Sequence, residues 1–260
     1  MTKAAVRAHT NIALIKYWGK ADETLFLPMN SSLSLTLDGL YTDTFVEISD
    51  TFTEDQFYLN DVLQSPEETA KISRFLDLFR NKAGITHFIQ VKSINHVPTA
   101  AGLASSASAF AALAGAMNRA TGLNMDLETL STYARRGSGS ATRSLFGGFV
   151  EWQKGTSSED SMAVPVDDAS WDIGMVIIAV NKSAKKISSR VGMKQTVETS
   201  PFYPAWVASA GEDLLAIKKA IKARDFEKVG QITEHSAMKM HGSMLGAETP
   251  IIYFEPDSIK

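Results

Sequence analysis

The sequence predicts an α+β protein, because strand patterns and helix patterns both recur along its 260 residues. Apolar and polar side chains alternate over residues 33–37, which is typical of a half-buried β-strand. Apolar residues keep helical spacing over residues 66–82 and again over residues 204–224, which predicts two amphipathic helices. A chain of this length can form one large domain or two small ones.

Composition and charge exclude several classes of protein. Hydrophobic residues make up 44% of the chain, charged residues 21%, and the net charge is −3. No basic field therefore favours nucleic acid or an anionic membrane, and we expect neither as a partner. The absence of cysteine excludes disulfides and zinc–thiolate sites, and it is compatible with the cytoplasm, where we expect the protein. The N-terminus lacks the apolar core of a signal peptide, and the longest apolar run, 175–180, is too short to span a bilayer.

The other elements follow from local patterns and caps. Asn60-Asp61 separates two short apolar runs and predicts a hairpin. Gly84 ends the helix that Pro66 begins, and Asp126 caps a helix that reaches Arg135. Further strands are expected over residues 4–8, 42–49, 87–92, 146–152 and 171–180, the last of them buried, and further helices over residues 109–120 and 226–240.

The stretch from Pro98 to Ser108 joins a turn of small residues to an alanine-rich helix. Gly102 has no Cβ, so the backbone there can approach a ligand closely. Ser105, Ser106 and Ser108 place hydroxyls beside the first free N–H groups of the helix, an arrangement that favours a phosphate. The alternative is a tight turn before a closely packed helix, since the Walker A and G-x-G-x-x-G motifs are both absent.

A second Gly/Ser turn, residues 136–144, carries arginine. Its two glycines free the backbone, and Ser138 and Ser140 can donate hydrogen bonds. The planar guanidinium of Arg143 can bind a phosphate through two parallel hydrogen bonds. Together the two turns predict a site where two phosphorylated groups face each other, because anion donors converge there.

Residues 11–20 contain Lys16, Tyr17 and Lys20, which place two cations and a phenol within five positions. These lysines could bind an anion or could be solvated at the end of a strand. The five histidines have no metal-ligand spacing, so we expect them to be structural or surface residues.

Four motifs stand in one order: Asn-Ile-Ala-Leu-Ile-Lys-Tyr-Trp-Gly-Lys at 11–20, the turns at 98–108 and 137–144, and Ser-Ser-Arg at 188–190. In these motifs the chain resembles the bacterial type of diphosphomevalonate decarboxylase across essentially its whole length. That family belongs to the superfamily of galactokinase, homoserine kinase and mevalonate kinase. The resemblance implies a two-domain small-molecule kinase fold. A ribosomal protein S5-like N-terminal domain would span residues 1–180, and a ferredoxin-like C-terminal domain, incomplete, would span residues 181–260.

The resemblance also implies a cytoplasmic, ATP- and Mg²⁺-dependent lyase of the mevalonate pathway of isoprenoid biosynthesis. In this family ATP phosphorylates the tertiary 3-hydroxyl of mevalonate 5-diphosphate. Loss of that phosphate and of the carboxylate then gives isopentenyl diphosphate. The expected partners are mevalonate 5-diphosphate, ATP and, when the protein is complete, a second copy in a homodimer. The resemblance assigns no metal ligands.

Roles carry over from the family to matching positions. Lys20 and Arg143 are the expected catalytic residues, and Asn11 is expected to orient Arg143. The residues expected to contact the substrate are Asn11, Tyr17, Lys20, Ser138, Gly139, Ser140, Arg143, Ser189 and Arg190, the last two at the 5-diphosphate. The residues expected to contact the nucleotide are Lys71, Ser93, Asn95, Gly102, Leu103, Ala104, Ser105, Ser106, Ser108 and Lys185.

The chain departs from the family in one respect. The family's catalytic aspartate lies in a late Met-Asp-Ala-Gly-Pro-Asn motif, and nothing in residues 1–260 matches it. We expect a fragment or incomplete gene product, whose unpaired apolar edge would invite association. A ligand-binding copy without turnover, or a substitute for the aspartate, are the alternatives. A mevalonate-type kinase without decarboxylation and a non-catalytic nucleotide-binding module also stay open as functions.

Overall fold

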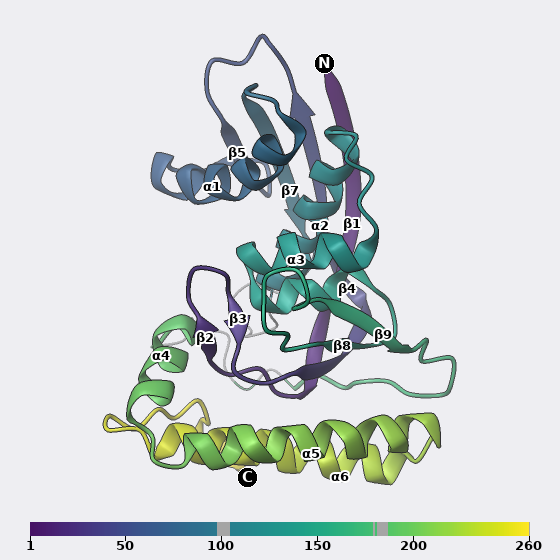
Figure 1. Cartoon of the computed structure of the whole chain (residues 1–260), viewed down its shortest axis with the longest axis vertical. Coiled ribbons are helices and arrows are strands. Elements are labelled where there is room, and N and C mark those ends of the chain that lie inside the picture. Colours follow the sequence, from purple (N-terminus) through teal and green to yellow (C-terminus); the bar gives the residue numbers. More distant parts are fainter. Residues whose placement is uncertain (98–104, 179, 181–186, 260) are drawn as a thin grey trace. The chain divides into compact units, whose positions relative to one another are not determined.

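The computed structural model describes residues 1–97, 105–178, 180 and 187–259, and it confirms the α+β class (Figure 1). In this part of the chain, seven strands form one sheet in the order β6-β5-β7-β4-β8-β9, with β1 paired to β4. Strands β2 and β3 form a separate pair. The strands are β1 (Thr2–Ile15), β2 (Lys20–Asp22), β3 (Leu27–Pro28), β4 (Ser32–Ile48), β5 (Gln56–Leu59), β6 (Val62–Leu63), β7 (Ile89–Asn95), β8 (Phe149–Trp152) and β9 (Ala163–Asp167).

The helices at 66–83, 127–137 and 203–222 lie within two residues of their predicted bounds, whereas the helix at 105–120 begins four residues earlier, and the helix at 226–245 ends five residues later, than predicted. Ser65 caps α1 by accepting from the backbone N–H of Glu68, and Gly84 ends it in the left-handed conformation at φ 67°. Asp126 caps α3 by accepting from the backbone N–H of Thr129. None of the described helices is long and apolar enough to cross a membrane. The helices are α1 (Pro66–Ala83), α2 (Ser105–Ala120), α3 (Leu127–Gly137), the 3₁₀ helix η1 (Gly139–Leu145), α4 (Ser189–Thr199), α5 (Tyr203–Lys222), α6 (Phe226–Leu245) and α7 (Pro256–Ile259).

The described chain divides into two compact units, and each is assembled from separate stretches of sequence. Among the described residues, unit 1 comprises 1–11, 37–97 and 105–146, and unit 2 comprises 12–36, 147–178, 180 and 187–259. Strands β1 and β4 therefore contribute residues to both units. The predicted domain boundary at residue 180 divides the chain by sequence rather than by these units, and it stays a prediction.

In unit 1, helices α1, α2 and α3 pack on one face of the sheet (Figure 1). Residues 42–48 of β4 pair antiparallel with β7, and β5 pairs with β7 in parallel. Every second side chain of these strands points toward the helices, as the two-residue period of a strand requires. The core includes Val46, Ile48, Ile89 and Val91 from the strands and Phe75, Phe79, Ala111 and Met117 from the helices, all buried.

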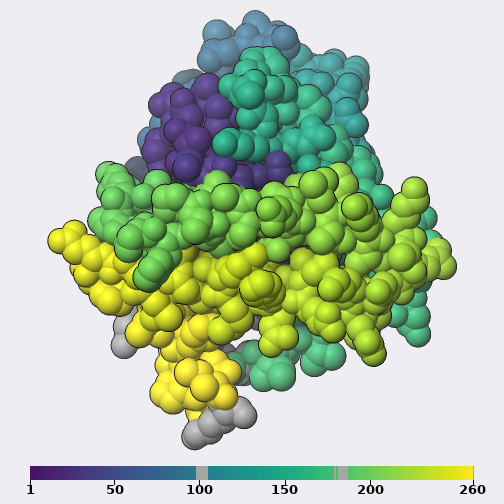
Figure 2. Space-filling view, turned by 60° about the horizontal axis from the view of Figure 1, so that its bottom comes forward, coloured from purple at the N-terminus to yellow at the C-terminus, as the bar shows by residue number. Residues whose placement is uncertain are grey.

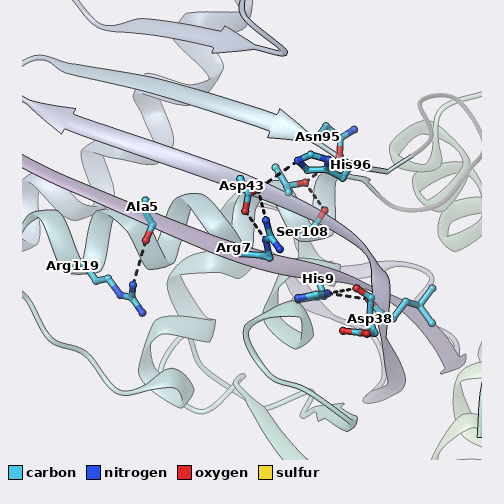
Figure 3. A network of polar contacts seen from close by, with 11 residues as sticks. Ala5, Arg7, His9, Asp38, Asp43, Asn95, His96, Ser108 and Arg119 are labelled. Atoms are coloured by element: carbon cyan, nitrogen blue, oxygen red, sulfur yellow. Dashed lines mark hydrogen bonds and ion pairs between the residues drawn. The ribbon is translucent and has the colours of Figure 1, made fainter.

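The opposite face of this sheet carries a polar cluster around Asp43, shown in Figure 3. Arg7 on β1 donates to Asp43 on β4 through Nε at 2.8 Å and Nη2 at 2.9 Å. The same guanidinium lies 3.8 Å from the centre of the Tyr41 ring, and His96 Nε2 lies 3.5 Å from Asp43 Oδ2. The hydrogen bond from Arg7 holds the pKa of Asp43 below its usual range. These contacts fix the register between β1 and β4 on the side that the helices leave open.

In unit 2, two long antiparallel helices pack against strand side chains. Figure 2 shows α5 in green and α6 in yellow-green, lying side by side along their lengths. Residues 32–35 of β4 pair with β8, which pairs in turn with β9. A first core joins these strands to the helices through Leu14, Ile15, Leu33, Phe149, Ile217, Ile221 and Val229. A second core surrounds Trp18 with Tyr203, Trp206, Met240, Met244 and Ile251.

The structure corrects two predicted segments. The strand expected over residues 171–180 is wrong in its described part, since residues 171–178 form no strand and Val176 and Ile178 are 89% and 83% exposed. Apolar composition predicts burial, but a strand also needs a partner for its backbone groups. Residues 189–193, for which the sequence predicts no helix, form the first turns of α4, where Ser188 caps the helix by accepting from Val191 N at 3.3 Å.

Candidate active site

Asn11 and Arg143 form the centre of the candidate site in unit 1. Asn11 Nδ2 donates to the Ser140 carbonyl oxygen at 3.0 Å and to the Ser144 hydroxyl at 2.8 Å. Asn11 Oδ1 accepts from Arg143 Nη2 at 3.5 Å. Asn11 is 3% exposed and Arg143 1% exposed, so these contacts hold the guanidinium away from bulk solvent. One amide side chain thus joins β1 to both ends of the η1 turn.

A row of hydroxyl groups continues from this centre to the first turn of α2. Ser138 Oγ lies 3.2 Å from Ser140 Oγ and 3.3 Å from Ser106 Oγ. Gly137 makes this approach possible, because a Cβ at that position would lie 2.1 Å from the Phe110 ring. Gly139, which begins η1, is buried beside the row. The structure therefore brings together the predicted residues of the two Gly/Ser turns that it describes.

Three further predicted nucleotide residues of unit 1, Ser93, Asn95 and Ser108, bond to side chains of neighbouring elements. Ser108 Oγ lies 2.8 Å from Thr42 Oγ1 and donates to the Ser105 carbonyl oxygen at 3.2 Å. Ser93 Oγ lies 2.9 Å from Thr44 Oγ1, and both hydroxyls are buried. Asn95 Oδ1 accepts from Thr42 Oγ1 at 3.1 Å (Figure 3). These three side chains connect β4, β7 and α2, the elements that position the start of α2.

Lys71 lies on α1 and pairs with neighbours on its own helix. Its ammonium is 3.1 Å from Glu67 and 2.5 Å from Glu68, and its side chain is 47% exposed. The hydrogen bond to Glu68 raises the pKa of Lys71 and so favours its charged form. The described contacts do not join Lys71 to the serine row.

In unit 2, Tyr17 and Lys20 flank the buried Trp18. The Tyr17 ring packs on Trp152 of β8, with ring centres 4.8 Å apart. Lys20 Nζ donates to Glu23 at 2.6 Å and lies 3.9 Å from the centre of the Phe26 ring. The Lys20 side chain is only 5% exposed. A cation that is held this way can be released to an anion that competes with Glu23.

Ser189 and Arg190 are the first two residues of α4. The Ser188 side chain satisfies one of the free N–H groups there, and Arg190 is exposed. A helix N-terminus with an adjacent arginine favours an anion through its remaining donors and its dipole. Burial raises the pKa of the Tyr253 hydroxyl, which also forms a hydrogen bond with Ser189 that acts in the opposite direction.

Four predicted nucleotide residues, Gly102, Leu103, Ala104 and Lys185, lie outside the described residues. Within the described ranges, no group of three His, Cys, Asp or Glu side chains could hold a metal ion. Each unit nevertheless offers donors to anions: hydroxyls and a buried guanidinium in unit 1, and an ammonium, an exposed guanidinium and a helix N-terminus in unit 2.

The residues that hold the 16–20 segment are not predicted from the sequence. Tyr203 OH donates to the Trp18 carbonyl oxygen at 2.6 Å, and Trp18 Nε1 donates to Thr196 Oγ1 at 3.1 Å. Asn30 Nδ2 donates to the Lys16 carbonyl oxygen at 2.9 Å. Nothing local in the sequence marks these contacts, although a buried tryptophan between two polar residues signals that the segment needs partners.

Two family models match consecutive parts of the chain. Residues 8–163 match the diphosphomevalonate decarboxylase-like N-terminal domain. Residues 175–260 match the mevalonate 5-diphosphate decarboxylase C-terminal domain. All the described site residues lie within these two matches.

Curated relatives and solved structures agree with the family models. The chain is 40% identical to the diphosphomevalonate decarboxylase of Candida albicans, over all of this chain and 76% of that protein. It is 42% identical to the human enzyme, over 95% of this chain and 66% of that protein.

Among solved structures, the mevalonate diphosphate decarboxylase of Enterococcus faecalis is 52% identical with a TM-score of 0.92, over 99% of this chain and 79% of that one. The enzyme of Staphylococcus aureus is 46% identical with a TM-score of 0.93, over 99% and 78%. A structure described as MDDEF in complex with MVAPP, AMPPCP and magnesium is 52% identical with a TM-score of 0.93, over 99% and 80%. The sequence motifs, the fold and these matches together show that the chain belongs to the diphosphomevalonate decarboxylase family.

Proposed function

We propose that this protein acts in the ATP-dependent decarboxylation of mevalonate 5-diphosphate to isopentenyl diphosphate, with release of ADP, phosphate and carbon dioxide. The observation that carries the proposal is the buried Asn11–Arg143 pair, which lies beside the row of serine hydroxyls in unit 1. A buried guanidinium beside hydroxyl donors suits a substrate that carries a carboxylate and a diphosphate. The activity in the names of the relatives requires both groups.

The site residues take complementary parts in this proposal. Arg143, with Ser138, Gly139 and Ser140, binds the anionic groups of the substrate, and Asn11 orients the guanidinium. Tyr17 and Lys20 lie against the substrate, and Lys20 stabilises charge near the reacting oxygen. Ser189 and Arg190 bind the 5-diphosphate at the start of α4. The support is the set of contacts that positions these residues: Asn11 with Arg143, Glu23 with Lys20, and the Ser188 cap at the start of α4.

The chemistry explains why the site needs this much fixed charge. A tertiary hydroxyl is a weak nucleophile, so it must be held in line with the γ-phosphoryl group of ATP. Phosphate is a better leaving group than hydroxide, and its departure leaves positive charge developing on the carbon. Preorganised cations and donors stabilise the negative charge that develops on the departing phosphate.

ATP and magnesium fit the described residues in part. The first turn of α2 presents Ser105 and Ser106 at a helix N-terminus, which suits phosphate oxygens. Ser93, Asn95 and Ser108 support that turn from inside, and Lys71, Gly102, Leu103, Ala104 and Lys185 complete the proposed nucleotide set. Magnesium is commonly bound by one or two carboxylates together with phosphate oxygens. We therefore infer that the ion reaches this chain on the phosphates of ATP.

We also propose that the protein works in the cytoplasm as a homodimer. The lack of cysteine is compatible with a reducing compartment. Light scattering behind size-exclusion chromatography tests the dimer, because the chain mass is 28.3 kDa.

The decisive experiment measures ADP and carbon dioxide released by this 260-residue chain with ATP, magnesium and carboxyl-labelled mevalonate 5-diphosphate. Equal amounts of both products support the decarboxylase. ADP without carbon dioxide would identify a kinase. Binding of both ligands without ADP would identify a nucleotide-binding module, and absence of binding would overturn the proposal.

A further inference from the structure

We propose that Trp18 joins the two substrate-binding segments of unit 2 into one rigid piece, and that Tyr203 and Thr196 are positioning residues that hold Trp18 in place. The inference rests on the proposed function, because it assigns Tyr17 and Lys20 on one side, and Ser189 and Arg190 on the other, to the same substrate.

The backbone of the segment is fixed at Trp18 and Gly19. Tyr203 OH donates to the Trp18 carbonyl oxygen at 2.6 Å, and Met29 N donates to the Gly19 carbonyl oxygen at 3.1 Å. Gly19 has a φ of 118°, and a Cβ there would lie 2.0 Å from the Tyr203 hydroxyl oxygen. Only glycine allows the phenol to approach the backbone this closely. Tyr203 therefore sets the direction in which the chain leaves Trp18 toward Lys20.

The indole of Trp18 reaches α4, the helix that begins with Ser189. Its Nε1 donates to Thr196 Oγ1 at 3.1 Å, and Thr196 donates in turn to the Gly192 carbonyl oxygen at 2.7 Å. A Cβ at Gly192 would lie 3.2 Å from the indole ring, so ring and helix backbone are in close contact. Trp18 is 7% exposed and Thr196 is fully buried, which makes an unpaired indole N–H costly.

Tyr253 provides a second link between Trp18 and the start of α4. Its ring meets the Trp18 ring edge-on, with ring centres 6.0 Å apart. Its hydroxyl donates to the Ile187 carbonyl oxygen at 3.1 Å and also bonds to Ser189. The indole is thus held against α4 at Thr196 and, through Tyr253, against the residues that precede the helix.

The consequence concerns how the substrate-binding groups are placed. Tyr17 and Lys20 are within two residues of Trp18, and Ser189 and Arg190 are on the helix that Trp18 contacts. When Trp18 loosens, the two pairs lose their fixed separation, and a substrate that must touch both pairs binds less well. Preorganised sites lose affinity when their supporting contacts are removed, even if no ligand contact is changed.

The test uses the full chain with Tyr203→Phe and Thr196→Val, each of which removes one hydroxyl and keeps most of the side-chain volume. Matched controls are Tyr133→Phe on α3 and Thr233→Val on α6, where Thr233 Oγ1 is buried and has no hydrogen-bond partner among the described residues. Binding of mevalonate 5-diphosphate is measured by calorimetry. We expect the two test variants to bind roughly 3- to 10-fold more weakly, and the controls to bind like the parent chain.

Two further measurements separate positioning from a general loss of stability. Hydrogen exchange without ligand should rise in a peptide covering residues 16–20 of Tyr203→Phe, while peptides from α1 and α2 keep their protection. In a double-mutant cycle with Lys20→Met, the effect of Tyr203→Phe on affinity should largely disappear, because Tyr203 acts through Lys20.

The outcomes distinguish this inference from the proposed function. If the parent chain does not bind mevalonate 5-diphosphate, the proposed function fails, and the exchange experiment still tests whether Tyr203 and Thr196 hold Trp18 in place. Unchanged exchange at residues 16–20 in both test variants, or unchanged affinity in both, overturns the inference. Additive effects in the cycle overturn it as well, since they would show that Tyr203 does not act through Lys20.

Discussion

Arg143 Nη2 donates to Asn11 Oδ1 across 3.5 Å, and both side chains are almost completely buried. Asn11 meanwhile donates to the Ser140 carbonyl oxygen and the Ser144 hydroxyl, so one residue sets both the arginine and the turn that carries it.

Replacing Asn11 by alanine should weaken substrate binding roughly tenfold or more, because Arg143 loses its orienting acceptor and buried donors lose partners. Stability should fall by about 1–3 kcal/mol for the same reason. Asn118→Ala is the matched control, since Asn118 is also buried and bonds to both backbone groups of Met125. The control should lose stability and keep its affinity for mevalonate 5-diphosphate. Equal loss of affinity in both variants would contradict the role given to Asn11.

Removing the Ser138 hydroxyl should reduce affinity for mevalonate 5-diphosphate by a factor of about 5, which corresponds to one hydrogen bond. Ser138 lies between Ser106 and Ser140, so Ser138→Ala interrupts the row. Ser131→Ala on α3 removes a buried hydroxyl that donates to the Glu128 carbonyl oxygen and serves as the control. Isothermal calorimetry on both variants checks the expectation, which fails if the two behave alike.

Glu23→Gln should strengthen binding of mevalonate 5-diphosphate by a factor of about 2 to 5, because the exposed Glu23 carboxylate competes with the substrate for Lys20. Lys20→Met should weaken binding instead. The comparison is best made at low ionic strength, where the ion pair is least screened. If Glu23→Gln binds no more tightly than the parent chain at low ionic strength, Lys20 stays with its own neighbours when substrate binds.

Asp160 should titrate near pH 2 in the folded protein. Its carboxylate accepts from the backbone N–H groups of Ser157 at 2.7 Å and Thr156 at 2.8 Å, and these bonds lower its pKa from 3.8 to about 2. Because the folded pKa is below the unfolded one, the loop is stabilised above about pH 3.8 and loses that stabilisation as the pH falls toward 2. Carboxyl chemical shifts measured against pH check this, and a midpoint at 3.8 would contradict it.

The exposed apolar side chains of residues 175–178 should drive association. Val176 and Ile178 are 89% and 83% exposed, and apolar groups displayed in a row favour contact between chains. Val176→Ser combined with Ile178→Ser should lower concentration-dependent association in light scattering and leave the melting temperature unchanged. If the double variant and the parent chain associate at the same concentrations, the surface through which the chains associate lies outside residues 175–178.

The elements that the sequence predicts correctly are those with local causes. Helix α1 has an N-cap serine, helical spacing and a glycine at its end, and the hairpin turn at Asn60-Asp61 adopts positive φ at both residues. By contrast, the missed start of α4 depends on one capping serine within a polar stretch. Whether residues 171–178 form a strand depends on a partner strand elsewhere in the chain, which the local sequence does not specify.

In the candidate site too, residues with local signals are predicted, and contacts between distant positions are not. Asn11, Ser138 and Arg143 are found from motifs, because each motif is a continuous stretch whose residue types suit anions. The contact between Tyr203 and Trp18 joins positions 185 residues apart, and neither tyrosine nor tryptophan is unusual in its own segment. Three-dimensional structure is needed to see that the Tyr-Trp-Gly-Lys stretch is held by two helices from the far end of the chain.

The interleaved composition of the two units has a consequence for biosynthesis. Leu14 and Ile15 leave the ribosome early, but they are buried against Ile217, Ile221 and Val229, roughly 200 residues later. During translation the end of β1 therefore waits as an apolar segment without its final partners. Unit 2 can complete its core only after α5 and α6 have been made, and the nascent chain passes through a long interval in which chaperones compete with misassembly.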